Sequence, residues 1–264
     1  MYLKKISLIV CLSCISFCSY AQRIAIIGAM LEEIRLLTEA LKKKHIIKYK
    51  DLTFYTGYLK GQSVVIMKSG IGKVNAAYST TILLEKFKIK SVLFTGVAGG
   101  LHPNSYPGDL IVAEAVFHHD YARDMANEYE VRATRNINGQ NDNPLLFKTD
   151  SVLLNLAKSC VRKISFLAVG SRNPKVFTGI IATGDTFVNN PIKANWLYEN
   201  FQALAVEMEG ASLGQICYQR NIPFLIIRSC SDNANNSAHL DFQTFLKPAA
   251  ENAIKVILGI LEEL

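Results

Sequence analysis

A short apolar run that ends abruptly at small polar residues constrains the fold of this 264-residue chain more than any other feature. The run is Pro223-Phe-Leu-Ile-Ile-Arg-Ser-Cys-Ser-Asp232. Its apolar part is too short and too β-branched for a helix, which predicts a buried central strand of an α/β sheet. Ligands collect at the carboxyl ends of such strands, where Arg228, Ser231 and Asp232 would lie. The alternative is that Ser231 and Asp232 only cap the next helix.

Similar apolar runs that end in glycine or acidic residues recur along the chain and predict further strands. Arg23 to Met30 and Ser91 to Gly100 end in glycine turns, whereas Ala203 to Val206 leads into Glu207-Met208-Glu209. Further strands are expected at 53–59, 63–68, 109–117 and 175–182, and helices at 31–41, 74–87, 153–160, 210–219 and 242–264. With 50% hydrophobic and 19% charged residues and no internal repeat, residues 22–264 are expected to form one compact α/β domain.

Residues 1–21 have the pattern of a secretory signal peptide. Two lysines precede an apolar core from Ile6 to Phe17, and Ser19-Tyr20-Ala21 forms a small-x-Ala cleavage site. The apolar core is too short for a permanent membrane span. We therefore expect cleavage before Gln22, a mature chain without a stable membrane span, and export to the periplasm or the outside of the cell.

Cysteine and charge content narrow the function classes. The three cysteines outside the leader, Cys160, Cys217 and Cys230, are too few for a disulfide framework. A lipid anchor at Cys14 or Cys18 is the alternative to a free mature chain.

The formal charge of +7 falls to +5 (7 − 2) without the two leader lysines. Basic residues are scattered, apart from a lysine run at 42–44 that we interpret as a solvated helix end, so nucleic acid is not an expected partner.

Two motifs suggest phosphate or metal binding, but neither has the spacing that such a site needs. Ser69-Gly-Ile-Gly-Lys73 lacks Walker spacing and the third glycine of a dinucleotide fingerprint. Its glycines are better interpreted as a close backbone approach to a neutral ligand or a neighbouring strand. His118-His119-Asp120 has no further histidine at ligand spacing, so neither a metal nor a cofactor is expected.

The polar stretch from Tyr121 to Pro144 is predicted to be a long loop at a rim or subunit contact.

Four predicted strand ends carry Glu33, Phe187, Glu209 and Asp232, and a doubly wound sheet would bring these ends to one rim. Glu33 also fits the first turn of the helix predicted at 31–41, where it would complement the helix dipole. Three carboxylates beside an aromatic side chain suit glycosyl chemistry on a nucleoside. One carboxylate can activate water, one can bind the ribose hydroxyls and one can protonate the departing base.

Six motifs carry a resemblance to a known family. They are Ile-Ile-Gly-Ala-Met-Leu-Glu-Glu33, Lys-Ser-Gly-Ile-Gly-Lys73, Thr-Gly-Val-Ala-Gly-Gly100, Gly-Asp-Thr-Phe187, Val-Glu-Met-Glu209 and Arg-Ser-Cys-Ser-Asp232. In this order, over nearly the whole mature chain, they resemble the motifs of 5′-methylthioadenosine/S-adenosylhomocysteine nucleosidases. The resemblance implies a three-layer α/β/α sandwich of the nucleoside phosphorylase type, a homodimer, and hydrolysis of methylthioadenosine and adenosylhomocysteine. By the same resemblance, 5′-deoxyadenosine or adenosine would be further substrates.

The same resemblance implies roles for individual residues. Glu33 falls on the base that activates water, Asp232 on the acid that protonates N7 of adenine, Glu209 on the carboxylate that holds the ribose diol, and Phe187 on the residue that stacks on adenine. The other positions expected at the substrate are Met208 beneath the sugar, the backbone of Val188 at the base edge, Arg228 and Ser231 near the water and the acid, Met30, Ile71 and Phe242 around the ribose and the 5′ group, and Glu207.

One departure and two rival functions bear on this interpretation. Val97 stands where some members of the family have a serine near the reaction centre. A purine nucleoside phosphorylase would use phosphate in place of water, but the dianion would approach Glu32 and Glu33, a like-charge contact that is unfavourable. A secreted nucleoside-binding protein without activity needs no acid at the base and no base across the ring, so Glu33 and Asp232 argue against it.

Export predicts that the native protein begins at Gln22, because signal peptidase cleaves after the small-x-Ala sequence. Amino-terminal sequencing of the protein from its natural host, separately for the cytoplasmic and exported fractions, measures this directly. A chain that keeps Met1 in the cytoplasmic fraction contradicts the prediction.

Overall fold

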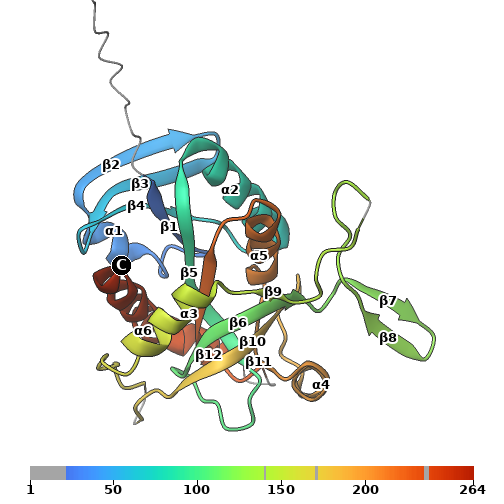
Figure 1. The fold of residues 1–264 in the computed structure, drawn as a ribbon. Coiled ribbons are helices and arrows are strands. Elements are labelled where there is room, and N and C mark those ends of the chain that lie inside the picture. The colour runs from blue at the N-terminus through green and yellow to red at the C-terminus, as the bar shows by residue number, and fades with distance from the viewer. Residues whose placement is uncertain (1–21, 140, 170–171, 235–237) are drawn as a thin grey trace, which may run out of the picture.

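The computed structural model describes residues 22–139, 141–169, 172–234 and 238–264, and the predicted leader lies outside them. A mixed sheet of ten strands runs through the molecule (Figure 1). Its centre is formed by four parallel strands: β1 (Arg23–Gly28), β4 (Gln62–Lys68), β5 (Ile89–Gly100) and β12 (Phe224–Asp232). The run that begins at Pro223 is therefore a central strand, as its apolar sequence predicts, and every residue of β12 is buried.

The second group of strands runs against the first. β6 (Leu110–His118) pairs antiparallel to β12, and β10 (Val176–Thr183) and β11 (Ala203–Glu207) continue parallel to β6. β11 then pairs with the far end of β5, at Ala205 to Gly100 and Val206 to Gly99. The strands β5, β12, β6, β10 and β11 thus close into a ring. The expected doubly wound sheet is replaced by a mixed one, and the closure brings the carboxyl ends of β5, β11 and β12 together.

Helices cover both faces of the sheet, which confirms the predicted three-layer α/β/α sandwich. Along β1, Ala25 and Ile27 pack toward α2 (Lys73–Lys86) and α5 (Gly210–Gln219), whereas Ile24 and Ile26 pack toward the opposite layer. That layer contains α1 (Arg35–Glu39), α3 (Ser151–Cys160) and α6 (Ala238–Glu263). A strand that is apolar on both sides is the expected result of helices on both faces. Within the described ranges, no helix has both the length and the hydropathy of a membrane span.

Two local predictions differ from the structure, and one helix was not predicted. The helix expected at 31–41 is only α1, because the chain first turns at Met30 to Ile34. The lysines at 42–44 begin β2 (Lys42–Tyr49), which pairs with β3 (Leu52–Leu59) at the sheet edge. Lysines on an edge strand discourage pairing with other chains. A helix that was not predicted, α4 (Pro191–Phe201), begins where Asn190 accepts hydrogen bonds from the backbone of Ile192 and Lys193, a cap that the Asn-Pro sequence indicates.

The stretch from Tyr121 to Pro144 is not a structureless loop. It contains a two-stranded hairpin, β7 (Ala122–Met125) with β8 (Glu128–Val131), which projects from the body of the protein (Figure 1). A bridge between Arg135 and Asp142 orders the rest, and the short strand β9 (Phe147–Lys148) returns the chain to β6. Two-residue hairpins without an Asn-Gly or Asp-Gly pair give little sequence signal.

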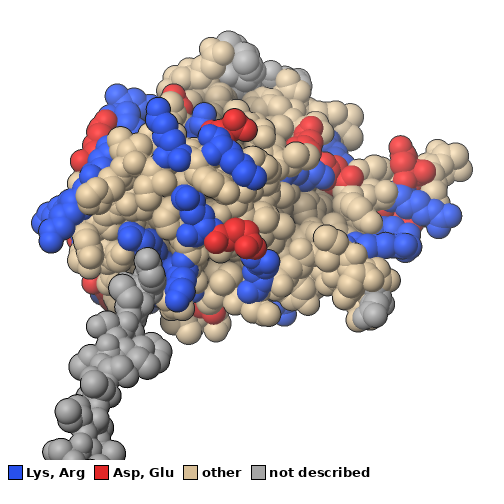
Figure 2. Space-filling view, turned by 90° about the horizontal axis from the view of Figure 1, so that it is seen from above, with Lys and Arg blue, Asp and Glu red and all other residues tan. Residues whose placement is uncertain are grey.

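On the face seen in Figure 2, charged side chains stand in small groups. Figure 2 shows lysine and arginine side chains on the face seen there, with acidic side chains between them. This distribution agrees with the scattered basic residues of the sequence. The three cysteines outside the leader, Cys160, Cys217 and Cys230, are buried free thiols.

Candidate active site

A cavity of about 300 Å³ opens where the carboxyl ends of β1, β5, β11 and β12 meet. All but one of the residues expected at the substrate line it. They are Met30, Glu33, Ile71, Phe187, Val188, Glu207, Met208, Glu209, Ser231, Asp232 and Phe242. The exception is Arg228, whose guanidinium is buried among the carboxylates of the site. Residues that are more than 200 positions apart in sequence are therefore neighbours in the fold.

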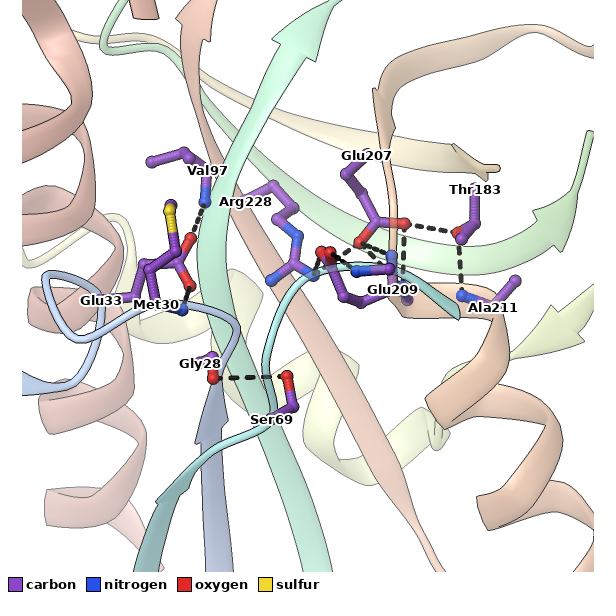
Figure 3. A network of polar contacts seen from close by, with 12 residues as sticks. Gly28, Met30, Glu33, Ser69, Val97, Thr183, Glu207, Glu209, Ala211 and Arg228 are labelled. Atoms are coloured by element: carbon purple, nitrogen blue, oxygen red, sulfur yellow. Dashed lines mark hydrogen bonds and ion pairs between the residues drawn. The ribbon is translucent and has the colours of Figure 1, made fainter. Parts of the chain in front are cut away.

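Glu33 lies in the turn between β1 and α1 rather than in the first turn of a helix. Its carboxylate folds back over the strand ends, where Oε2 accepts from the backbone N–H of Met30 at 2.9 Å and Oε1 from that of Val97 at 3.0 Å (Figure 3). The residue is 2% exposed. Burial raises the pKa of Glu33 above its usual range, although the charge of Arg228 and the backbone donors partly oppose this effect.

Gly96 allows Glu33 and Arg228 to approach the backbone of β5. A Cβ atom on Gly96 would lie 2.5 Å from Nη1 of Arg228 and 2.8 Å from Oε1 of Glu33. Both distances are below van der Waals contact, so only glycine leaves room for the two charged groups. The Thr-Gly-Val sequence shows that a glycine stands here. The reason for that glycine is the space needed by Glu33 and Arg228, which come from the turn after β1 and from β12.

Arg228 is the largest fully buried side chain of the described residues. Its Nη2 lies 2.6 Å from Oε2 of Glu207 and 3.7 Å from Oε2 of Glu209 (Figure 3). Its guanidinium also stacks on Phe94, 4.1 Å from the centre of the ring. Burial alone lowers the pKa of Arg228, but the charges of Glu207, Glu33 and Glu209 outweigh it and raise the pKa. Nε and Nη1 have no hydrogen-bond partner within the described part of the chain.

Glu207 connects Arg228 to the start of α5. Its carboxylate accepts from the backbone N–H of Glu209 at 3.1 Å, from that of Gly210 at 2.8 and 2.9 Å, and from the hydroxyl of Thr183. The same hydroxyl accepts from the backbone of Ala211 at 2.8 Å. A carboxylate at a helix N-terminus is stabilised by the unpaired N–H groups there. Glu207 borders the cavity, but its two oxygens are already held by protein donors.

Glu209 ties the loop after β4 to the beginning of α5. Its Oε1 accepts from the backbone N–H of Gly72 at 2.7 Å, and the residue is 5% exposed. Burial, and then the neighbouring charge of Glu207, raise the pKa of Glu209. Gly72 has a φ of 92°, and a Cβ there would lie 3.0 Å from the carboxylate of Asp185. Gly72 thus approaches two carboxylates closely, while Ser69 in the same motif hydrogen-bonds the end of the neighbouring strand β1.

Asp232 is the last residue of β12. Its Oδ2 accepts from the hydroxyl of Ser231 at 2.8 Å, and its Oδ1 from the backbone N–H of Ala234 at 2.8 Å. A Cβ on Gly99 would lie 3.0 Å from Oδ1, so the neighbouring strand also leaves space for the carboxyl group. Asp232 thus binds the turn that follows it, and the helix-cap alternative concerns residues 235–237, which lie outside the described residues.

Apolar side chains form the opposite wall of the cavity. Phe187 is 43% exposed and meets Phe242 edge to face, with ring centres 6.0 Å apart. Phe242 and Met30 pack on a small cluster that contains Val97. Val97 therefore presents an apolar side chain to the cavity, while its backbone N–H still binds Glu33.

The two adjacent histidines do not join this site. His118 hydrogen-bonds Gln215 through Nε2 at 3.1 Å. His119 is packed against Gly184, where a Cβ would lie 2.4 Å from Nε2, and burial lowers the pKa of His119 to about 4. In the described ranges, no three His, Cys, Asp or Glu side chains are grouped in a way that fits a metal ion.

Comparisons with known proteins relate the chain to nucleoside-cleaving enzymes. A family model described as the phosphorylase superfamily matches residues 23–262. A 5′-methylthioadenosine/S-adenosylhomocysteine nucleosidase of Bacillus cereus is 41% identical over 92% of this chain and 99% of its own length. The nucleosidase of Colwellia psychrerythraea, solved in complex with adenine, is 37% identical with a TM-score of 0.80, covering 92% of this chain and 96% of its own. That of Neisseria meningitidis, in complex with methylthio-immucillin-A, is 33% identical with a TM-score of 0.78, covering 92% and 100%.

Gly96→Ala is expected to destabilise the protein by about 1–3 kcal/mol, because the added methyl group overlaps Arg228 and Glu33 in a packed interior. Thermal unfolding measures the effect, which corresponds to a midpoint lower by roughly 2–4 °C for each kcal/mol. The control is Gly61→Asn, where no atom lies within 4 Å of the added Cβ and where asparagine tolerates the φ of 83°. Equal midpoints for the two variants would contradict the close approach at Gly96.

Proposed function

Because the chain belongs to the 5′-methylthioadenosine/S-adenosylhomocysteine nucleosidases of the phosphorylase superfamily, we propose that it hydrolyses the N-glycosidic bond of these two nucleosides. The products are adenine and the corresponding ribose derivative. One observation carries the proposal: Glu33, Glu209 and Asp232 line a single cavity whose opposite wall is aromatic and apolar. This is the set of groups that the departure of a base from a sugar requires.

Asp232 acts as the general acid. Adenine is a poor leaving group, so the glycosidic bond breaks readily only when N7 receives a proton as the ribose becomes oxocarbenium-like. The hydroxyl of Ser231 and the backbone of Ala234 hold the carboxyl group of Asp232 at the end of β12. Phe187 stacks on the adenine face, and such a stacking contact contributes about 1–3 kcal/mol to binding. The backbone of the buried Val188 contacts the base edge.

Glu33 acts as the base that activates water on the other side of the sugar. Backbone donors from Met30 and Val97 fix its two oxygens and favour the ionised form. Nη1 of Arg228 has no protein hydrogen-bond partner among the described residues and lies close to Glu33 across Gly96. Because Arg228 does not line the cavity, it acts on Glu33 through its charge, behind the position of the attacking water. The raised pKa of Glu33 makes it a stronger base than an exposed glutamate.

Glu209 binds the ribose hydroxyls between the acid and the base, with Met208 beneath the sugar. The N–H of Gly72 engages one of its oxygens, and the diol donates to the other. Glu207 is a positioning residue, because it holds Arg228 and the start of α5 rather than the substrate. Met30, Ile71 and Phe242 surround the 5′ group with apolar surface.

Charge in the cavity favours water over phosphate as the nucleophile. A phosphate dianion would be placed beside Glu33 and Glu209, and the cation nearest to them, Arg228, is already paired with Glu207. Like-charge contact in a buried site disfavours such an ion. A purine nucleoside phosphorylase is therefore the weaker alternative, and a non-catalytic nucleoside-binding protein would have no use for Asp232 and Glu33.

Two further parts of the proposal concern assembly and location. A homodimer is supported by the projecting β7–β8 hairpin and by exposed apolar side chains beside the cavity, among them Ile71 and Val74, and implies twice the mass of one chain in solution.

Export as a single domain of residues 22–264 is supported by the family match, which begins at residue 23, directly after the predicted leader. A lipid anchor remains the alternative form of export.

Asp232→Asn keeps the shape of the side chain but removes its proton, so kcat for methylthioadenosine should fall roughly 10²- to 10⁴-fold with substrate binding largely kept. Glu33→Gln removes the base and should have a similar effect. Steady-state release of adenine by the purified mature chain, without phosphate, measures both. Asp142→Asn, at an exposed position, is the matched control. If Asp232→Asn cleaves at nearly the wild-type rate, the assignment of the acid is wrong.

The pH dependence of kcat/KM should reflect the raised pKa of Glu33. A base works only when it is ionised, so activity is lost as pH falls through its pKa, which burial places above the ordinary value of 4.5. The acidic limb of the profile is therefore expected above pH 4.5, and the residual activity of Glu33→Gln should lack that limb. A wild-type limb at or below pH 4.5 contradicts the assignment.

A further inference from the structure

The charged ends of two short motifs have no part in the reaction described above, and they meet beside the cavity. Lys73 ends the sequence Gly-Ile-Gly-Lys, and Asp120 ends His-His-Asp. Nζ of Lys73 lies 2.6 Å from Oδ1 of Asp120, and only 21% and 22% of the two side chains are exposed. A largely buried ion pair therefore joins the start of α2 to the turn after β6.

Asp120 also holds the loop that follows β10. Thr183 at the end of β10 pairs with His118 at the end of β6, which makes neighbours of the residues two positions further on, Asp185 and Asp120. Oδ2 of Asp120 accepts from the backbone N–H of Asp185 at 2.8 Å. Burial alone would raise the pKa of Asp120, but the hydrogen bonds from Lys73 and Asp185 outweigh it and lower the pKa. One ionised carboxylate thus binds the helix start with one oxygen and the loop with the other.

Asp185 completes this set of contacts. Its Oδ1 accepts from the backbone N–H of Lys73 at 2.7 Å. Gly72, the N-cap residue of α2, has no side chain that could accept from the N–H groups at the helix start. The carboxylates of Asp185 and Glu209 accept from them instead. The loop after β10 and the sugar-binding carboxylate are therefore fixed to adjacent residues of the same helix.

These contacts bear on adenine because the loop after β10 carries the residues proposed to bind the base. Phe187 and Val188 line the cavity two and three positions after Asp185. Phe187 is 43% exposed, so the position of its ring depends on how the backbone of its loop is held. At the beginning of the loop, Gly184 packs against the imidazole of His119. The turn after β6 therefore supports the whole first part of the adenine loop.

We propose that Asp120 and Lys73 are positioning residues for adenine binding. They hold the loop that carries Phe187 against the helix start that binds Glu209, so that the base and the ribose of one nucleoside meet their partners together. Neither residue lines the cavity, so both act through the loop rather than on the substrate. The inference rests on the proposed function and adds to it two residues that position the base.

The two products of hydrolysis separate the two parts of the site. Adenine contacts the loop after β10, whereas methylthioribose contacts Glu209 and the apolar residues around the 5′ group. Asp120→Ala should raise Kd for adenine about tenfold, which corresponds to the loss of part of a stacking contact. Kd for methylthioribose should stay within about twofold of wild type, because Gly72 still donates to Glu209. Isothermal titration calorimetry of the mature chain measures both.

Steady-state kinetics provide a second readout. KM for methylthioadenosine should rise together with Kd for adenine, while kcat changes less than about threefold, because Glu33 and Asp232 are held by other contacts. Lys73→Met removes the cation that pairs with Asp120 and should also weaken adenine binding. The double variant should bind adenine no more weakly than Asp120→Ala alone, since both changes remove the same interaction. Lys73→Met also replaces Asp120→Ala in the test should that variant not fold.

Glu114→Ala is the matched control, because Glu114 lies on β6 and pairs with Lys158 at 3.0 Å. This ion pair is exposed, and its loss should leave both Kd values and KM unchanged. An unchanged Kd for adenine in both Asp120→Ala and Lys73→Met overturns the proposal. So does an equal rise for both products, which would mean a general structural effect. A wild-type chain that cleaves neither nucleoside contradicts the proposed function instead, before any variant is compared.

Discussion

The buried guanidinium of Arg228 is the interaction on which the rest of the site depends. It lies among Glu207, Glu209 and Glu33, all of which are nearly inaccessible to solvent. Burying three carboxylates without a cation would cost far more than a fold of this size can offset. Arg228 reduces this cost, and the N–H groups of Gly72, Val97 and the start of α5 reduce it further. The charged site and the strand ends therefore stabilise one another.

The sheet determines where those charges meet. β6, β10 and β11 run antiparallel to β12, so in an open sheet the carboxyl ends of the two groups would lie at opposite edges. Because β11 pairs with the carboxyl end of β5, the two sets of ends lie together instead. Glu209 follows β11, Asp232 ends β12, and Glu33 reaches across from the turn after β1. The proposed acid, base and sugar-binding carboxylate thus come from three different connections. Each accepts a backbone hydrogen bond: Glu33 from Val97 in β5, Glu209 from Gly72 before α2, and Asp232 from Ala234 after β12.

Two turns, after β1 and after β4, separate an apolar and carboxylate-lined cavity from a polar one that carries both signs of charge. Glu33, Glu209 and Asp232 all line the first cavity, and none of the three lines the second. The three carboxylates are therefore gathered on one side of these turns.

The sequence by itself determined most strands, because apolar runs are local patterns. The three-layer fold and most of the residues that line the cavity followed from its resemblance to a known family. The sequence did not determine that the strands close into a ring, that the helix after β1 is short, or that residues 121–144 contain a hairpin. Nor did it reveal the role of Gly96 or that Glu207 holds Arg228. Those features depend on contacts between distant segments, and the free energy of burying a charge is decided only by the neighbours that the tertiary structure provides.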